Sequence, residues 1–419
     1  MKRLFMVLVS LVFITACANL PQNRKRPQVD KPIVVLVGID GLRADYIDHY
    51  DAPALQQMAK DGVRAEYMTP VMPSVTFVNF YTLATGLYAE HTGITANMPY
   101  SRKWDEVMDR TMHGQGRWWG GEPIWVTAEK QHEKSAAMFW LGSEAEIKGV
   151  RPSIWNKYDH YKPNGERVDQ VLSWLALPGK DRPRFITIYF ADVDSAGHRY
   201  GPDSVEVANA VKEVDGRVAD IRAGIKKLGL ENKVNVIVVS DHGMTATSGD
   251  RMVYLDDYIN LDDVFIPRFD TKAGASVGPF VHMFVKDGDK AKIDQLYKQL
   301  KGKNPHMKVY KFKDIPKDWH LNNDDRVGDL FVVAENGWLL WGHGLKSKYP
   351  KPPAGMHGYD RFEPDMRASF LAVGPNIRRL HMVKPFENVE VYGIIAKILG
   401  LKPAKTDGDI HRVDYMLKP

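Results

Sequence analysis

The chain has 419 residues, of which 44% are hydrophobic and 26% are charged, so it can bury a large core in one to three domains. Its formal net charge of +5 falls to +3 without Lys2 and Arg3, which is too weak a balance to indicate nucleic-acid binding. One cysteine excludes a disulfide within the chain.

The first sixteen residues have the pattern of a secretory signal. A basic start precedes an apolar run over residues 4–14, which is too short to span a bilayer comfortably. The run ends at Ile14-Thr15-Ala16-Cys17, which resembles the bacterial lipobox, in which the cysteine is lipidated. The resemblance implies an envelope lipoprotein anchored through Cys17. The alternative is a plain signal peptide with an incidental cysteine.

Residues 17–30 are predicted to be a lipidated tether. Two prolines and the basic cluster Arg24-Lys25-Arg26 favour an extended linker. Ala18 rather than Asp follows the cysteine, which under the Gram-negative sorting rule indicates the outer membrane, facing the periplasm. We therefore predict a signal peptide over 1–16, the tether over 17–30 and the functional domain over 31–419.

Strands and helices are predicted to alternate through that domain. Short apolar runs rich in β-branched residues indicate buried strands at 33–39, 185–190, 234–239 and 368–373. Helical patterns cover 54–60 and 205–228, the second ending before Gly229. This alternation predicts an α/β fold with a mainly parallel central sheet flanked by helices. Residues from about 245 to 345 break it, and we expect a smaller inserted α+β lobe with strands at 281–285 and 327–334 and a helix at 290–300.

Polar clusters follow the first three of these strands, where open α/β sheets bind ligands. They are Asp40-Gly41, Asp192-Val193-Asp194 and Ser240-Asp241-His242-Gly243. Carboxylates and imidazoles are zinc ligands, and a hydrolytic site with two metals needs about six of them. The set that supplies this number is Asp40, Asp194, His198, Asp241, His242 and His357.

Each of these signals is weak when taken singly. An Asp at a strand end is commonly a cap or turn residue. Asp194 and His198 have the spacing of a helical surface pair, although Gly197 and the following Gly201-Pro202 favour a loop. His357 has the surroundings of an exposed loop histidine. The combination of all six favours a metal site.

Thr76 is the candidate nucleophile. An apolar helical stretch that ends at Gly86 begins close to it, so Thr76 is predicted to lie near a helix N-terminus. There the helix dipole and free N–H groups stabilise an alkoxide and attract phosphate. The alternative is that Ser74 or Thr76 only caps the helix.

Several short segments of the chain, which include most of the residues named above, resemble the motifs of the nucleotide pyrophosphatase/phosphodiesterase (type I phosphodiesterase) family of the alkaline phosphatase superfamily. They occur in the same order as in that family. The matching segments run from residue 33 to the carboxyl end: Val37-Gly38-Ile39-Asp40-Gly41, Thr76-Phe77 with Tyr81 through Tyr88, Gly121-Glu122-Pro123-Ile124-Trp125, Gly142-Ser143-Glu144, Asp194 through Pro202, Ser240 through Met244, and His357-Gly358-Tyr359-Asp360.

The resemblance implies two zinc ions and a role for each site residue. One zinc would be held by Asp194, His198 and His357, and the other by Asp40, Asp241, His242 and the Thr76 oxygen. Asn97 would donate to a phosphoryl oxygen, with an ordinary turn residue as the alternative. Phe77 and Tyr158 would sandwich a nucleobase, with core packing as the alternative.

The resemblance also has limits. Val78-Asn79-Phe80 replaces the Pro-Asn-His or similar run that usually follows Thr-Phe, and residues 100–119 have no clear counterpart. The lack of disulfides and extra domains indicates the compact bacterial form rather than the animal secreted form.

The implied activity is hydrolysis of nucleotide phosphodiester or pyrophosphate bonds through a threonyl-phosphate ester. Zinc fits the mixed carboxylate and imidazole ligands better than manganese. The expected partners are a small-molecule substrate and the membrane at Cys17, without a stable nucleic-acid partner. The alternatives are a choline-phosphodiester hydrolase, a phosphomonoesterase, or a nucleotide-binding lipoprotein without catalysis.

Overall fold

The computed structural model describes residues 31–267, 278–345 and 351–419. The predicted signal peptide, Cys17 and the tether lie outside the described residues. Residues 31–419 group into one unit by their contacts. Among the described helices, none is long and apolar enough to cross a membrane.

The centre of this unit is an eight-stranded sheet in the order β18-β2-β17-β9-β1-β8-β6-β7. In that order the strands are His381–Val383, Val63–Ala65, Phe370–Val373, Val234–Val239, Ile33–Ile39, Phe185–Phe190, Ser135–Met138 and Ile154–Trp155. β1 pairs in parallel with β8 and β9, while β17 is antiparallel to both β9 and β2. The predicted α/β fold with a mainly parallel sheet is confirmed.

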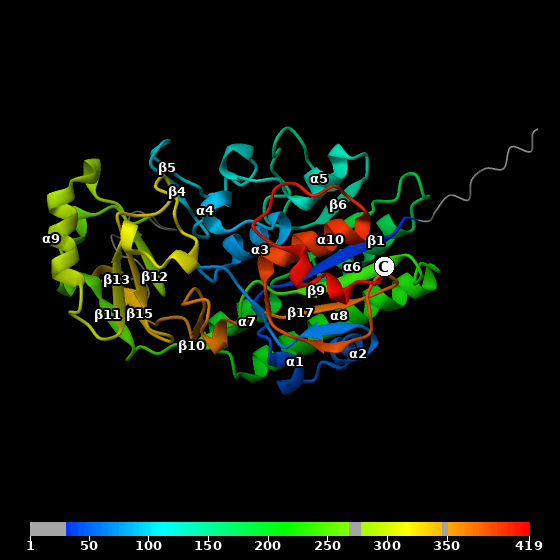
Figure 1. The fold of residues 1–419 in the computed structure, drawn as a ribbon. Coiled ribbons are helices and arrows are strands. Elements are labelled where there is room, and N and C mark those ends of the chain that lie inside the picture. The colour runs from blue at the N-terminus through cyan, green and yellow to red at the C-terminus, as the bar shows by residue number, and fades with distance from the viewer. Residues whose placement is uncertain (1–30, 268–277, 346–350) are drawn as a thin grey trace, which may run out of the picture. The chain divides into compact units, whose positions relative to one another are not determined.

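Helices cover both faces of the sheet, which explains the continuous apolar strands (Figure 1). Every residue of β1 is buried. The helices are α1 (Tyr46–His49), α2 (Pro53–Asp61), α3 (Thr76–Thr85), α4 (Ala89–Thr92), α5 (Ile124–Lys130), α6 (Asn164–Leu175), α7 (Asp192–Tyr200), α8 (Val205–Lys227), α9 (Lys290–Leu300) and α10 (Val391–Leu399). α10 contacts β1, α3 and α5, and α8 contacts α2, α6 and α7.

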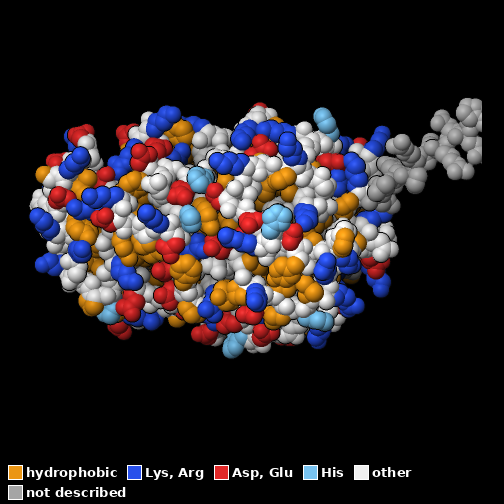
Figure 2. Space-filling model, viewed as in Figure 1, with side chains coloured by type: hydrophobic (Ala, Val, Ile, Leu, Met, Phe, Trp, Pro, Cys, Tyr) orange, Lys and Arg blue, Asp and Glu red, His pale blue; other side chains and the backbone are white. Residues whose placement is uncertain are grey.

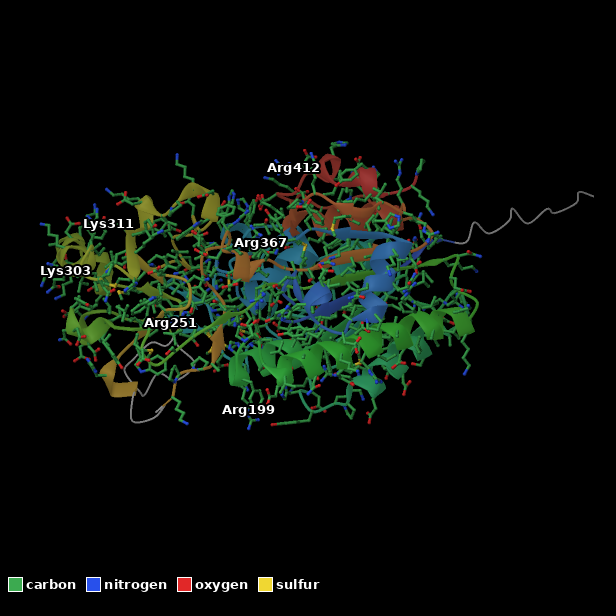
Figure 3. All side chains as sticks on the ribbon, turned by 90° about the horizontal axis from the view of Figure 1, so that it is seen from below. Arg199, Arg251, Lys303, Lys311, Arg367 and Arg412 are labelled. Atoms are coloured by element: carbon green, nitrogen blue, oxygen red, sulfur yellow. The ribbon has the colours of Figure 1, made fainter. Side chains whose placement is uncertain are left out.

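A second set of strands lies mostly between residues 245 and 356. β12 (Phe280–Met283), β14 (Leu330–Ala334) and β13 (Met307–Lys311) form an antiparallel sheet that carries α9. This region has its own hydrophobic cluster, which includes Val253, Leu296 and Val332. Seen from below, Lys303 and Lys311 lie on this part, far from Arg412 on the carboxyl-terminal segment (Figure 3). The inserted lobe with limits at about 245–345 stays a prediction.

The remaining strands form short pairs. They are β3 (Met68–Thr69) with β19 (Phe386–Glu387), β4 (Tyr100–Ser101) with β5 (Glu106–Val107), β10 (Thr245–Ala246) with β16 (Gly355–Met356), and β11 (Met252–Tyr254) with β15 (Leu339–Trp341). β10 and β16 matter most for the site, because their antiparallel pairing joins the segment after His242 to the segment before His357.

Candidate metal centre

The polar clusters meet at the carboxyl edge of the central sheet. Asp40 follows β1, Asp241 follows β9, and Asp194 lies in the helix that follows β8. Because β8, β1 and β9 are parallel neighbours, their carboxyl ends lie side by side. Gly41 has φ +68°, and a Cβ there would lie 3.0 Å from Asp194 Cα, so glycine permits this close approach.

Asp40, Asp241 and His242 form one buried group. Their candidate ligand atoms lie within 4.8 Å of one another. His242 Nε2 is 2.9 Å from Asp241 Oδ2 and 3.4 Å from Asp40 Oδ1. On its other side, His242 Nδ1 donates to the Gly243 carbonyl at 2.8 Å, which leaves Nε2 as the atom that faces the carboxylates.

Asp194, His198 and His357 form a second group of the same size. Asp194 Oδ1 lies 3.3 Å from His198 Nε2 and 3.4 Å from His357 Nε2. The expectation of a loop here is wrong, because Asp194 and His198 occupy successive turns of α7. Gly197 does not break this helix; it makes room for Met244, whose Cε would lie 2.8 Å from a Cβ at that position.

His357 reaches the site through the β10–β16 pair and is 3% exposed, so the exposed-loop alternative does not hold. Its ring stacks on His242 with centroids 3.5 Å apart, which brings the two groups next to each other. His357 Nδ1 lies 3.0 Å from the Ser74 carbonyl, and His198 Nδ1 lies 2.9 Å from the Gly355 carbonyl. Both histidines therefore direct Nε2 into the site.

The atoms that face into the two groups lack hydrogen-bond donors. Asp40 Oδ1, Asp194 Oδ1 and Asp241 Oδ2 are buried without a partner among the described residues. In addition, His198 Nε2 and His357 Nε2 point at each other across 3.2 Å. Buried polar atoms are normally satisfied, so this set has the character of a cation site. Its carboxylate and imidazole atoms fit zinc or a similar divalent ion.

The charges in the centre lead to the same inference. Burial, followed by the charges of Asp241 and Asp194, raises the pKa of Asp40 well above its usual range. Burial and the neighbouring His242 and His198 hold the pKa of His357 well below its usual range, which favours the neutral imidazole that binds metals. A divalent cation would relieve the repulsion among the carboxylates.

Thr76 begins α3 at the border of the first group. Its Oγ1 lies 3.3 Å from His242 Nε2. The residue before the helix is Val75, without a side-chain cap, and Ser74 Oγ instead donates to the Tyr359 carbonyl, so neither hydroxyl has the alternative capping role. Asn79 holds the segment before Thr76 by accepting from the Val71 amide at 2.7 Å.

Asn97 and Phe77 lie beside Thr76. Asn97 Oδ1 accepts from the Phe77 amide at 2.9 Å, so the Asn97 side chain is tied to the first turn of α3. The Phe77 ring is partly buried, with His113 at 4.9 Å and Trp119 at 6.2 Å between centroids. Sequence reasoning missed His113, which belongs to the segment without a family counterpart. Burial and the charge of Arg110 lower its pKa.

Tyr158 is 43% exposed and packs edge-on against Phe139 and Tyr189. Burial of its hydroxyl and the nearby charge of Asp40 raise its pKa, although Arg167 opposes them, so the ring lies near the metal centre. This exposure departs from the core-packing alternative. The base-binding roles of Phe77 and Tyr158 stay predictions, as do the roles of the metal ligands, Thr76 and Asn97.

Sequence reasoning also missed Tyr189. It lies in β8, is 7% exposed, and its hydroxyl donates to Asp40 Oδ2 at 2.5 Å. A tyrosine near the carboxyl end of an otherwise apolar buried strand was the available signal, since a buried hydroxyl needs a partner.

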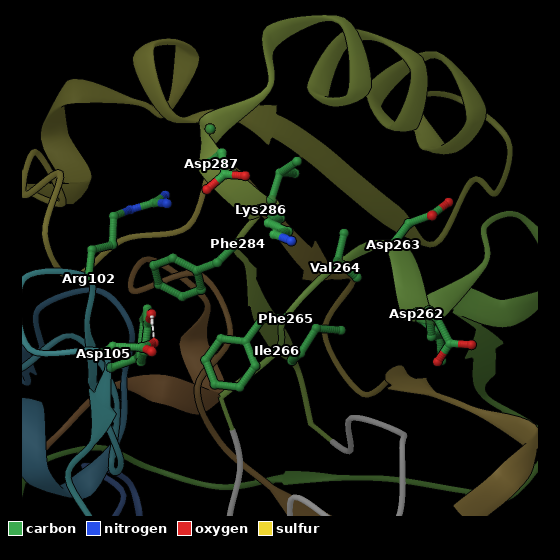
Figure 4. A pocket seen from close by; sticks show the side chains of 14 residues that line it. Arg102, Asp105, Asp262, Asp263, Val264, Phe265, Ile266, Phe284, Lys286 and Asp287 are labelled. Carbon is green, nitrogen blue, oxygen red and sulfur yellow. Dashed lines mark hydrogen bonds between the residues drawn. The ribbon is translucent and has the colours of Figure 1, made fainter.

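A separate cavity of about 930 Å³ lies between Tyr100–Asp105 and the two segments 261–266 and 284–288 (Figure 4). None of the candidate metal ligands lines it. Its Arg102 guanidinium pairs with Asp329 at 3.0 Å and lies over the Phe284 ring at 4.6 Å. The two candidate ligand groups therefore lie at the sheet edge and not in this cavity.

Comparison with known sequences identifies relatives along most of the chain. The venom phosphodiesterase of Naja atra is 36% identical over 408 residues, which cover 96% of this chain and 48% of that protein. An uncharacterized pyrophosphatase/phosphodiesterase of Schizosaccharomyces pombe is 35% identical over 387 residues, which cover 90% of this chain and 78% of that protein. Ectonucleotide pyrophosphatase/phosphodiesterase family member 3 of Mus musculus is 33% identical, and the match covers 96% of this chain and 46% of that protein. The chain thus spans about half the length of the snake and mouse relatives.

Similar solved structures include murine ectonucleotide pyrophosphatase/phosphodiesterase 5, with a TM-score of 0.84 and 29% identity over 92% of this chain and 100% of that one. An inactive form of the same murine protein was solved in complex with AMP, and it matches with a TM-score of 0.84. The family model described as type I phosphodiesterase / nucleotide pyrophosphatase matches residues 34–360. This chain therefore belongs to the type I phosphodiesterase / nucleotide pyrophosphatase family.

Proposed function

We propose that the chain is a two-zinc hydrolase that cleaves nucleotide phosphodiester or pyrophosphate bonds with Thr76 as its nucleophile. The observation that carries this proposal is the pair of three-residue ligand groups, with the Thr76 hydroxyl 3.3 Å from His242 Nε2. Membership of the family supports the same reaction. The names of relatives support it too, since the snake and mouse proteins are called phosphodiesterases.

Thr76 acts in both steps of the proposed reaction. Thr76 Oγ1 loses its proton to solvent and attacks phosphorus, the bond to the leaving oxygen breaks, and that oxygen takes up a proton. Water then attacks the threonyl-phosphate, which breaks the bond to Oγ1 and restores the hydroxyl. Zinc, when bound, supplies positive charge that lowers the pKa of oxygen nucleophiles and stabilises developing negative charge. Two inversions retain the configuration at phosphorus, so inversion with a chiral substrate would contradict the covalent route.

Groups around Thr76 suit a phosphoryl ester. The first turn of α3 lies next to the nucleophile, where the helix dipole favours an anion, while the Phe77 amide of that turn donates to Asn97. Asn97 lies against the same turn and can present its amide N–H groups to a phosphoryl oxygen. Phe77 and Tyr158 supply aromatic faces, which stack with any base. The AMP complex of the murine relative supports a nucleotide ligand.

The experiment compares zinc-dependent hydrolysis of a chromogenic nucleotide diester, a choline phosphodiester and a phosphate monoester by the purified chain. We expect the nucleotide diester to dominate, with at least a thousandfold loss in Thr76→Ala, on the order of the loss of a nucleophile. Thr85→Ala is the matched control, since its hydroxyl donates to the Tyr81 carbonyl within the same helix. Dominance of another substrate would overturn the nucleotide assignment, and no turnover at all would favour a binding lipoprotein.

We further propose that Cys17 is lipidated and anchors the protein to the outer membrane, facing the periplasm. The motif before Cys17 supports lipidation, and Ala18 after it supports sorting to the outer membrane. Expression in a Gram-negative host with a labelled fatty acid should give a labelled protein in the outer-membrane fraction, and Cys17→Ser should lose the label. A labelled wild-type protein in the inner membrane would contradict the sorting, and an unlabelled one would contradict the anchor.

A further inference from the structure

The geometry points to Tyr189 as a positioning residue that holds Asp40 in the orientation needed to bind metal. This inference rests on the proposed two-metal function. It concerns a residue that belongs to neither candidate ligand group and that the reaction steps above do not use. The observation behind this inference is the hydrogen bond of 2.5 Å that the Tyr189 hydroxyl donates to Asp40 Oδ2.

The two oxygens of Asp40 have different surroundings. Oδ2 accepts from Tyr189, whereas Oδ1 is buried without a donor and lies 3.4 Å from His242 Nε2. Asp241 shows the same division, because its Oδ1 accepts from the Gly41 amide at 3.1 Å and its Oδ2 has no donor. In each carboxylate one oxygen is fixed by the protein and the other is left for a cation. Hydrogen bonds of this kind set the direction in which a ligand presents its lone pairs.

Tyr189 itself has little freedom to move. It lies in β8, where the parallel register pairs it with Gly38 of β1. Its ring packs edge-on against Phe80, with centroids 5.3 Å apart, and against Tyr158 at 6.0 Å. Asp40 is fixed from the same strand, since its amide donates to the Phe190 carbonyl at 2.9 Å. β8 therefore fixes both the backbone and the side chain of Asp40.

The test measures metal binding directly, without turnover. The full-length protein is titrated with Co²⁺ alone and followed by visible absorbance and calorimetry. We expect Tyr189→Phe to weaken one of two Co²⁺ sites by about 10- to 100-fold, the usual effect of removing a hydrogen bond to a ligand, and to leave the other unchanged. With nucleotide diester at limiting zinc, kcat should fall with KM unchanged, and excess zinc should restore kcat.

Tyr81→Phe is the matched control. Tyr81 is also a fully buried tyrosine, but its hydroxyl donates to the Gly120 carbonyl at 2.8 Å and not to a candidate ligand. A purely structural role would make the two variants alike, so equal loss of Co²⁺ affinity in both would overturn the inference. Wild-type affinity at both sites in a folded Tyr189→Phe protein would also overturn it.

A second measurement tests whether Tyr189 acts through Asp40. In the Asp40→Asn background the affected site is already weak, so adding Tyr189→Phe should cause no further loss of Co²⁺ affinity, whereas an independent effect would contradict the inference. Selective Co²⁺ weakening without nucleotide hydrolysis would support the role of Tyr189 and contradict the proposed substrate. Nucleotide hydrolysis with unchanged Co²⁺ binding in Tyr189→Phe would support the proposed substrate and contradict the role of Tyr189.

Discussion

Histidines of two regions, the sheet edge and the β12–β14–β13 sheet, differ in how their nitrogens are satisfied. His282 in β12 is 6% exposed, with Nε2 3.2 Å from the Thr95 carbonyl and Nδ1 3.4 Å from the Gly328 amide. At the sheet edge, His198 and His357 each use Nδ1 for a carbonyl but turn Nε2 toward the other. Burial alone therefore does not mark a site; several ligand atoms that converge within 4.8 Å of one another do.

Charge separates the regions as well. The carboxylates of the sheet edge lie close together and repel one another. The second region balances more of its charges, for example Lys292 with Asp263 at 2.7 Å, and on the face shown in Figure 2 the described basic and acidic side chains are interspersed. The crowded carboxylates of the sheet edge therefore favour a bound cation there.

The largest expected effect comes from substituting the two kinds of buried histidine. His357→Ala should remove one of two bound zinc ions and slow nucleotide diester hydrolysis at least about a hundredfold, equivalent to about 3 kcal/mol of barrier. His282→Ala should keep both ions and activity within about threefold, because it loses only local hydrogen bonds and packing. Elemental analysis with steady-state kinetics checks both. Zinc loss in His282→Ala would break the comparison.

Removing the metal should have the next largest effect. An ion that binds only the folded state stabilises that state by about 4 kcal/mol when its concentration is a thousand times Kd. EDTA should therefore lower the thermal midpoint, and His357→Ala should show about half of that response. An equal midpoint with and without EDTA would contradict a metal centre at the sheet edge. His282→Ala serves as the control with the full response.

The third prediction concerns pH and His282. Burial lowers its pKa to about 4, against an ordinary value of 6.5. As pH falls from 6.5 to 4, the unfolded chain takes up this proton and the folded chain does not, so about 3 kcal/mol of stability is lost. The loss should be absent in His282→Gln. Urea unfolding of metal-free protein at several pH values measures it, and parallel slopes for both proteins would contradict the prediction.

The smallest expected effect extends the comparison to a buried carboxylate away from the edge. Glu390 is 1% exposed and 3.6 Å from Arg412, and burial raises its pKa to about 7. The folded chain keeps a proton that the unfolded chain releases, so stability falls as pH rises from 4.5 through 7. Glu390→Gln should stabilise the protein by about 1–2 kcal/mol at pH 8, since a buried amide still needs partners. Destabilisation at pH 8 would mean that the charged carboxylate is stabilising there.

Much of the sheet could be predicted from the sequence. β1, β8 and β9 match the predicted limits, because strands buried on both faces give continuous apolar runs. α2, α8 and α9 match within one residue at each end. β12 ends before its predicted limit, because the apolar residues Phe284 and Val285 continue beyond the last ladder pair. β14 and β17 begin later than predicted, at Leu330 and Phe370. β2, β6, β7 and β18 were not predicted, because runs of two to four residues carry too little periodicity.

The sequence by itself also determined which residue types could hold metal and which segments they come from, because carboxylates and imidazoles follow recognisable strands. Only the tertiary structure decided that α7 is a helix, through packing of Met244 on Gly197. It also decided that β10 and β16 deliver His357 to His242, and that Tyr189 fixes Asp40. These features depend on contacts between residues far apart in the sequence, or on one atom of a side chain rather than its type, and a linear pattern carries neither.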